Sequence, residues 1–157
     1  SQPTNVGLRI YPNGNVTAPS SAGFSARGVN SYSGFPGNGV WKTYYPANEN
    51  FDKNDDFNIS NGKFTAPADG AYFFTVDGLI YAMAETNFGQ ARWLKNGSIY
   101  GQLMQFNGTG GNHRNFTFSI VMYMSVSDTA EFQIWRTSGQ SWSLYNSQFN
   151  IGGFLIG

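Results

Sequence analysis

Few residues in this chain of 157 could carry chemistry. Cysteine is absent, and the only histidine, His113, stands next to Arg114 at the end of a glycine-rich stretch. A serine nucleophile would need a histidine that is oriented by a carboxylate, and no acidic residue stands near His113 in the sequence. The residues therefore predict a protein that is not an enzyme.

An acidic cluster gives the weak candidates for a metal site, namely Asp52, Asp55 and Asp56. Carboxylate oxygens are ligands for calcium, but this segment lacks the glycine and glutamate of a recognised calcium loop. A hydrated acidic turn is the favoured interpretation. No other cofactor is expected, because residues 108–111 are not followed by the lysine of a phosphate loop.

The composition argues against two classes of partner. Nine basic and nine acidic side chains give a formal net charge of zero, and only 11% of the chain is charged, against about 25% in an average domain. A nucleic-acid-binding protein would show a basic patch or stripe, and a polybasic membrane contact would need clustered Lys and Arg. No apolar run reaches the roughly 18 residues of a membrane-spanning helix. We expect no nucleic acid and no membrane insertion.

Alternating apolar residues between Gly and Asn turns predict an all-β protein. Aromatic residues make up 17% of the chain, which suits a core between sheets. Residues 71–81 are nearly continuous in apolar side chains and are expected to form a strand buried on both faces. Asn96-Gly97 is the strongest hairpin turn. The main strands are expected at residues 24–29, 40–45, 51–57, 63–65, 71–81, 90–95, 98–106, 114–126, 129–135 and 150–156.

One set of residues follows a specific spacing. It consists of Asp52, Phe57, Phe64 and the motif Gly70-x-Tyr72-x-Phe74. This spacing resembles the signature of the globular head of the first complement component, subcomponent q, a family that shares its jelly roll with the tumour necrosis factor superfamily. Residues 24–26 and 149–155 resemble the opening and closing strands of that family. Pro46 and Val76 stand where its signature has aromatic residues, which indicates a distant relative.

The resemblance implies an all-β, ten-stranded antiparallel jelly-roll sandwich over residues 24–157, assembled as a homotrimer. It also implies that aromatic side chains of one sheet lie at the trimer interface or in the core, and relatives of this fold sometimes hold calcium near the trimer axis. The candidates for interface or core are Tyr72, Phe74, Phe116, Phe118, Tyr123 and Phe154.

Residues 1–23 are expected to form a separate stalk-like segment and linker. Residues 7–10 and 13–19 are similar to stalk segments of bacteriophage tail-fibre and other virion appendage proteins. Residues 18–23 have the composition of a linker. This likeness places the protein on a virion surface or otherwise outside the cell.

Antiparallel strands swap ends at each turn, which predicts where the loops lie. Counted back from the last strand, loops 82–89, 107–112 and 137–148 fall at the end remote from the stalk, and turns 96–97 and 127–128 fall at the stalk end. Rings and Arg beside Ser, Gly and Asn are typical of binding surfaces. The candidate ligand-binding residues are Glu85, Asn87, Phe88, His113, Arg114, Trp142 and Tyr145.

Three functions stay open on the sequence alone. The leading hypothesis is the trimeric head of a virion appendage, such as a phage tail fibre, that binds a glycan or protein receptor on the host cell, with a glycan favoured. The second is a secreted, lectin-like recognition module of the complement-head family. The third is a structural trimerisation cap or capsid decoration without a ligand.

Overall fold

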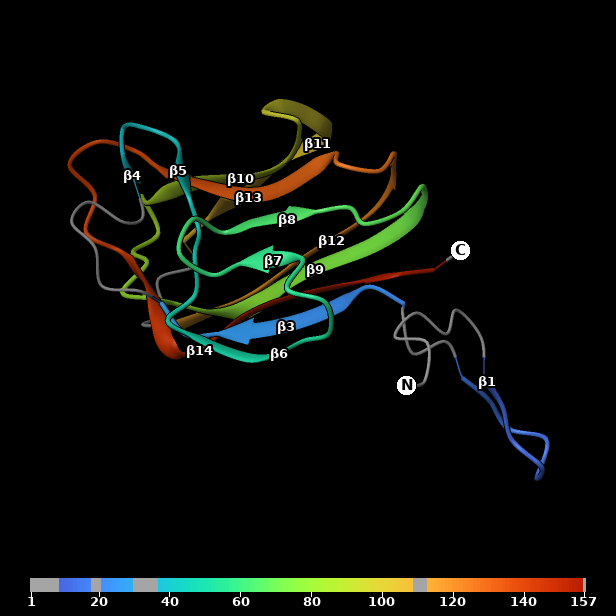
Figure 1. The fold of residues 1–157 in the computed structure, drawn as a ribbon. Helices are drawn as coiled ribbons and strands as arrows, with labels where there is room; N and C mark the ends of the chain where they lie inside the picture. Colours follow the sequence, from blue (N-terminus) through green and yellow to red (C-terminus); the bar gives the residue numbers. More distant parts are fainter. Residues whose placement is uncertain (1–8, 18–20, 30–36, 109–112, 157) are drawn as a thin grey trace.

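A computed structural model describes residues 9–17, 21–29, 37–108 and 113–156. Its first two strands, β1 (Arg9–Ile10) and β2 (Val16–Thr17), pair as an antiparallel hairpin with its turn at residues 11–15. The hairpin projects beside the main body in Figure 1. Residues 1–8 and 18–20 of the predicted stalk and linker lie outside the described residues.

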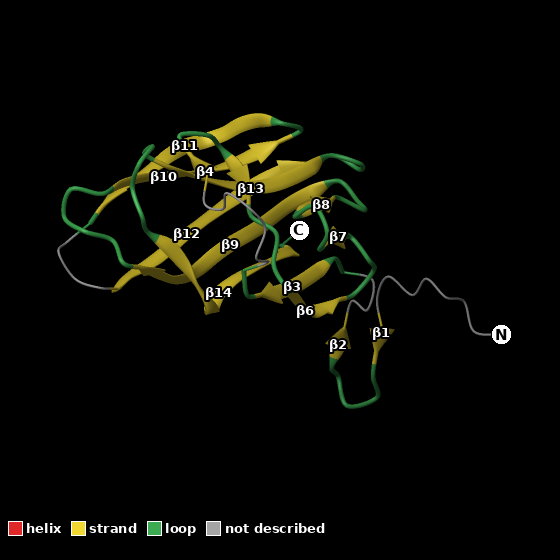
Figure 2. Cartoon of the chain, turned by 90° about the vertical axis from the view of Figure 1, so that its left-hand side faces the viewer, coloured by secondary structure: helices red, strands yellow, loops and turns green. Residues whose placement is uncertain are grey.

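The main body is a sandwich of two sheets (Figures 1 and 2). We call the first the β9 sheet, a five-stranded antiparallel sheet. In spatial order it contains β12 (His113–Met124), β9 (Gly70–Tyr81), β14 (Ser143–Leu155), β3 (Gly23–Arg27) and β6 (Asn48–Asp52). The strands β9 and β12 pair over their full lengths, from Gly70 opposite Met124 to Tyr81 opposite His113.

We call the second the β10 sheet. In order it contains β11 (Ser98–Asn107), β10 (Phe88–Lys95), β13 (Thr129–Arg136), β8 (Lys63–Thr65) and β7 (Phe57–Asn58). Two short strands, β4 (Gly37–Asn38) and β5 (Lys42–Thr43), also pair with β13, and the β4 pairing is parallel. The two paths of five strands confirm the predicted jelly-roll sandwich, and β4 and β5 make the second sheet seven-stranded.

The ends of the sandwich differ as the strand parity predicts. The chain enters at Gly23 and leaves at Leu155, whose N–H donates to the carbonyl of Ala22 over 3.1 Å. We call this end the base, and the turns after β10 and β12 lie there. The opposite end, the tip, holds the connections 82–87, 108–112 and 137–142, of which 109–112 lie outside the described residues.

The signature residues form one aromatic cluster in the core, which explains why their spacing reports the fold. The ring of Phe24 stacks on Phe57 at 4.1 Å between centroids and lies 5.5 Å from Phe64. Phe64 in turn contacts Tyr72 at 5.4 Å and Phe74 at 5.3 Å. These rings come from both sheets, so the motif joins the two layers.

Four of the strand predictions were wrong in detail. Strand β9 alternates between buried and half-exposed side chains and is not buried on both faces, because the second sheet covers only one of them. The acidic turn splits the predicted segment 51–57 into β6 and β7, and the predicted strand 40–45 is replaced by β4 and β5. The last strand starts at Ser143, so the tip loop before it is shorter than expected.

Candidate functional site

Two predicted tip residues are buried and cannot meet a ligand in this structure. Trp142 is fully buried, with its ring 5.5 Å from that of Phe106. Asn87 is also buried, and its backbone carbonyl accepts a hydrogen bond from Gly108, so it ties two tip connections together. Both residues support the tip from inside, and the prediction that they bind a ligand is corrected.

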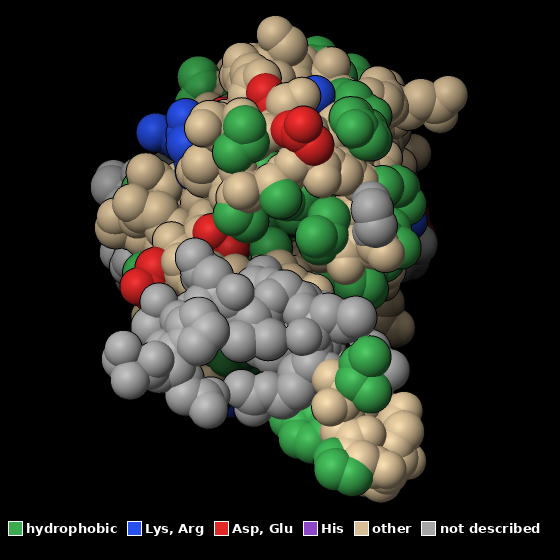
Figure 3. Space-filling view, turned by 45° about the vertical axis from the view of Figure 1, so that its right-hand side comes forward, with side chains coloured by type: hydrophobic (Ala, Val, Ile, Leu, Met, Phe, Trp, Pro, Cys, Tyr) green, Lys and Arg blue, Asp and Glu red, His purple; other side chains and the backbone are tan. Residues whose placement is uncertain are grey.

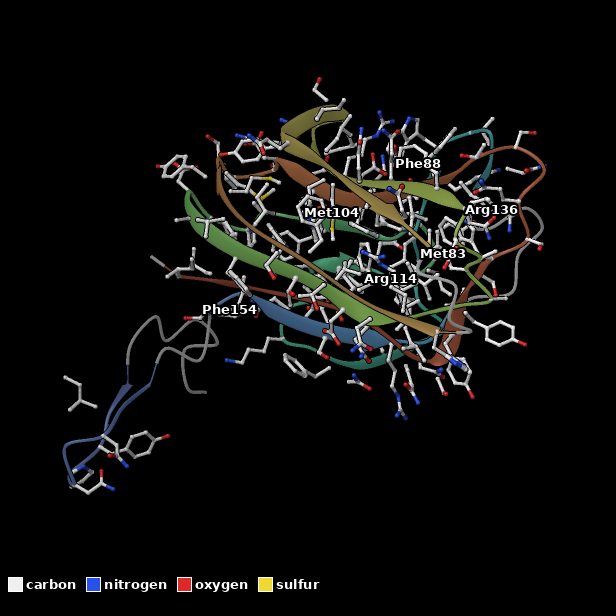
Figure 4. The ribbon with its side chains drawn as sticks, turned by 180° about the vertical axis from the view of Figure 1, so that it is seen from behind. Met83, Phe88, Met104, Arg114, Arg136 and Phe154 are labelled. Carbon is white, nitrogen blue, oxygen red and sulfur yellow. The ribbon has the colours of Figure 1, made fainter. Side chains whose placement is uncertain are left out.

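Arg136 also lies under the tip and is half-buried. Its Nη1 donates to the carbonyl of Trp142 over 2.6 Å, and burial lowers the pKa of this guanidinium. Its Nε and the indole Nε1 of Trp142 have no hydrogen-bond partner among the described residues. Figure 4 labels Met83, a fully buried side chain, at the same end of the molecule as Arg136.

Other predicted tip residues stay at or near the surface. Glu85 is exposed, and Phe88 is half-buried with its ring 5.9 Å from that of Trp135. Arg114 is half-buried and its Nη1 donates to the carbonyl of Asn107 (Figure 4). Its guanidinium is therefore partly used to hold the tip connection after β11.

Three rings meet on the outward side of the β9 sheet at the tip, and we call them the tip triad: Tyr81, His113 and Tyr145. Their centroids are 5.4 Å apart between Tyr81 and His113, 5.8 Å between His113 and Tyr145, and 6.4 Å between Tyr81 and Tyr145. These separations are typical of aromatic contacts. All three side chains are exposed, Tyr81 by 46% and Tyr145 by 38%. The structure thus brings two predicted residues together with one that the sequence analysis missed.

A polar hollow of about 480 Å³ lies beside the tip triad, on the same side of the β9 sheet. Its lining consists of Asp77, Gly78, Leu79, Asn115, Phe116, Thr117, Ser147, Gln148 and Asn150. The wall that contains Ser147 and Gln148 is a bulge, where the pairing of β14 with β9 shifts between Leu144 and Phe149. Gly78 allows this bulge to approach, because a Cβ there would lie 2.4 Å from the carbonyl oxygen of Gln148.

The predicted interface-or-core aromatics divide into two groups. Tyr72, Phe74 and Phe116 are buried in the core, and Phe118 is half-buried against it. Tyr123 and Phe154 are exposed by 60% and 52%.

The two exposed rings belong to an apolar surface near the base of the β9 sheet, which we call the base patch: Phe73, Val121, Tyr123 and Phe154. The register aligns Val121, Phe73 and Phe154 across three neighbouring strands, and the rings of Phe73 and Phe154 lie 5.4 Å apart. Figure 4 shows Phe154 at the end opposite Arg136. Figure 3, which turns the base end forward, shows hydrophobic side chains between a few acidic ones.

The acidic turn is not arranged as a metal site. The Oδ2 of Asp52 accepts a hydrogen bond from the N–H of Phe57 over 2.6 Å, and Oδ2 of Asp56 accepts one from the side chain of Asn54 over 3.2 Å. Burial raises the pKa of Asp56, the bond from Asn54 opposes this, and the charges of Asp52 and Asp55 add to the rise. No group of three His, Cys, Asp or Glu in the described part of the chain could hold a metal ion. The prediction of a metal site at Asp52, Asp55 and Asp56 is therefore corrected. The segment is a turn in which the carboxylates of Asp52 and Asp56 accept hydrogen bonds.

The comparisons with known proteins agree with this geometry at the level of the fold. No protein-family model matches the sequence, and no curated protein matches it. A solved structure, the globular domain of the zebrafish complement 1qA protein, superposes with a TM-score of 0.60 at 18% identity, over 88% of this chain and 98% of that chain. The chain has the complement 1q-like jelly-roll fold. The identity is too low to carry over a ligand or an assembly, and the likeness of residues 7–19 to tail-fibre stalks has no support from these comparisons and stays a prediction.

Within the described residues, no helix is long and apolar enough to cross a membrane.

Proposed function

We propose that the chain is the trimeric head of a virion appendage, such as a phage tail fibre, and that it binds a receptor on the host cell surface, a glycan, through its tip. The protein acts at the virion surface or outside the cell, by binding and not by catalysis. The complement 1q-like fold supports a head domain, and the similarity of residues 7–19 to stalk segments supports its place at the end of a fibre.

The observation that carries the proposal is the tip triad. Three rings in mutual contact are exposed where β9 ends and β12 and β14 begin. Their mutual packing limits the side-chain entropy that a ligand would have to remove. Tyrosine also offers a large apolar face and a hydroxyl group at its edge, which matches the C–H faces and hydroxyl groups of a sugar ring.

The trimer is supported by two different apolar surfaces on the same protomer. One is the base patch, and the other is the edge strand β11, on which Ile99 and Leu103 are exposed by 51% and 42%. When two different surfaces meet head to tail, the contact is heterologous and gives a ring if the rotation between copies closes, whereas a two-fold contact uses one surface twice. We propose three copies in the ring, because the complement heads that the sequence resembles are trimers.

A glycan array tests the receptor proposal. Wild-type protein should bind a restricted set of glycans, and Tyr81→Ala and Tyr145→Ala should each weaken that binding by about 10-fold or more, the effect of losing a recognition residue worth over 1 kcal/mol. The matched control is Tyr11→Ala, which removes an exposed tyrosine that belongs to neither the tip triad nor the base patch. Equal binding by wild type and both tip variants would overturn the role of the tip.

The base patch also favours a second candidate, a structural cap that trimerises the fibre and binds nothing. This function needs the base patch but not the tip triad. A cap would give a blank array, unchanged particle assembly in the Tyr81→Ala and Tyr145→Ala variants, and defective assembly when Phe154 is replaced by aspartate.

A further inference from the structure

We infer that the hollow between the β14 bulge and strands β9 and β12 is a saccharide subsite for an uncharged hexose unit. The inference rests on the proposed function, since it names the class of sugar that the head would bind. None of its lining residues was among the predicted ligand-binding residues, and Asp77 lies two rows of the sheet away from Phe73 of the base patch. The volume of about 480 Å³ lies within the roughly 300–1,000 Å³ of small-molecule pockets.

The hollow combines acceptors and donors that are free to bind. Among the described residues, the one side-chain hydrogen bond within the lining is from Asn150 to Oδ2 of Asp77, over 3.2 Å. The side chains of Asn115, Thr117 and Gln148 make none within the described chain and are exposed. A sugar hydroxyl both donates and accepts, so it can donate to the Asp77 carboxylate and accept from the amide groups of Asn115 and Gln148.

Leu79 is the apolar side chain that this hollow offers to a ligand, and it is half-buried. Gly78 and Phe116 also line the hollow, but the ring of Phe116 is buried in the core. Tyr81 follows two residues after Leu79 on the same side of β9, about 7 Å further toward the tip at the strand rise. A sugar in the hollow would therefore lie beside the tip triad, and a glycan chain can contact both.

The charge of the lining selects against acidic sugars. Asp77 is the one ionisable residue that lines this hollow, and no cation faces it from the lining. An anionic unit such as a uronic acid would place a second carboxylate against Asp77, and like charges at close range are unfavourable. A neutral hexose avoids this cost and keeps the carboxylate as its hydrogen-bond acceptor.

A second hollow of about 310 Å³ continues on the far side of the bulge. It is lined by Arg27, Gly28, Asn48 and Ser147, and Ser147 belongs to both hollows. The arrangement suits a ligand of more than one sugar unit, with the uncharged unit held beside Asp77.

The test is an amide-resolved NMR titration of residues 1–157 with a panel of neutral hexoses and the matching hexuronic acids. A neutral hexose at millimolar concentration should shift the amides of residues 77–79, 115–117 and 147–150, and the uronic acid of the same ring should bind at least about 10-fold more weakly. Asp77→Asn should weaken hexose binding by about 10-fold, as expected when a charged hydrogen-bond acceptor is replaced by a neutral one. It should also reduce the ratio between the affinities for the hexose and for the uronic acid. Thr117→Trp should fill the hollow and abolish the shifts.

The control is Asp55→Asn, which removes the same charge from an exposed turn outside the hollow and should leave binding unchanged. Shifts confined to Tyr81, His113 and Tyr145, or a uronic acid that binds as well as its hexose, would overturn the subsite while the tip proposal stands. If no sugar shifts any amide and the glycan array is blank, the subsite and the receptor proposal both fall. The melting temperature of each variant is measured as well. A value equal to that of wild type shows that the variant is folded, so that a loss of binding reflects the site.

Discussion

Replacing Gly78 by alanine would push a methyl group into the backbone of β14. The added Cβ would lie 2.4 Å from the carbonyl oxygen of Gln148, 2.7 Å from the Cα of Phe149 and 2.5 Å from its ring. Two of these three atoms are backbone and cannot rotate away, so the bulge must move. Overpacking of this kind costs typically about 1–3 kcal/mol, and we expect the upper end.

In a domain of this size each 1 kcal/mol lowers the melting temperature by about 2–4 °C. A cost of about 3 kcal/mol therefore predicts that Gly78→Ala melts roughly 6–12 °C below wild type, measured by circular dichroism. Gly23→Ala is the matched control, because its Cβ would have no neighbour closer than 3.6 Å. It should melt within about 2 °C of wild type. If Gly78→Ala and Gly23→Ala have the same melting temperature, the inference that the bulge packs closely against β9 at Gly78 is wrong.

The remaining predictions concern the base and the tip. Phe154→Asp should convert the trimer to monomers in sedimentation equilibrium, whereas Val40→Asp, at an equally exposed side chain outside the base patch, should leave it intact. Trp142→Ala should destabilise the fold by about 3–5 kcal/mol, the usual cost of removing a buried tryptophan; a stable variant that only loses ligand would refute its place in the core. Asp128 accepts hydrogen bonds from Asn96 and Ser125 and pairs with a lysine, which lowers its pKa from 3.8 to about 2. Its stabilising effect is complete above pH 3.8 and is lost as the pH falls toward 2, so denaturant unfolding of wild type and Asp128→Asn should differ at pH 5 and converge near pH 2.

The fold was accessible from the sequence because its strongest signal lies in the core. Phe57, Phe64, Tyr72 and Phe74 pack on one another across the two sheets, so their spacing is tied to the architecture itself. Strand parity also placed the connections correctly at tip and base, since it depends only on the number of reversals. The trimer and the stalk stay predictions.

The candidate site was less accessible, for two physical reasons. Tyr81 was treated as the end of a buried strand, although its odd-numbered position places it on the same outward side as Phe73, Thr75 and Asp77. That alternation was the signal that could have found it. The polar hollow had no such signal, because it depends on a bulge that brings residues 147–148 against β9. Trp142 was assigned to a ligand by residue type alone, and residue type does not tell which way a ring turns.

The most direct test of the central claim is the mass of residues 1–157 in solution, measured by light scattering across a range of concentrations. A trimeric head predicts about three times the 17.3 kDa of one chain, with the mass maintained on dilution to low micromolar concentration. A monomer at every concentration would contradict the trimeric head, and the base patch would then have no role in assembly.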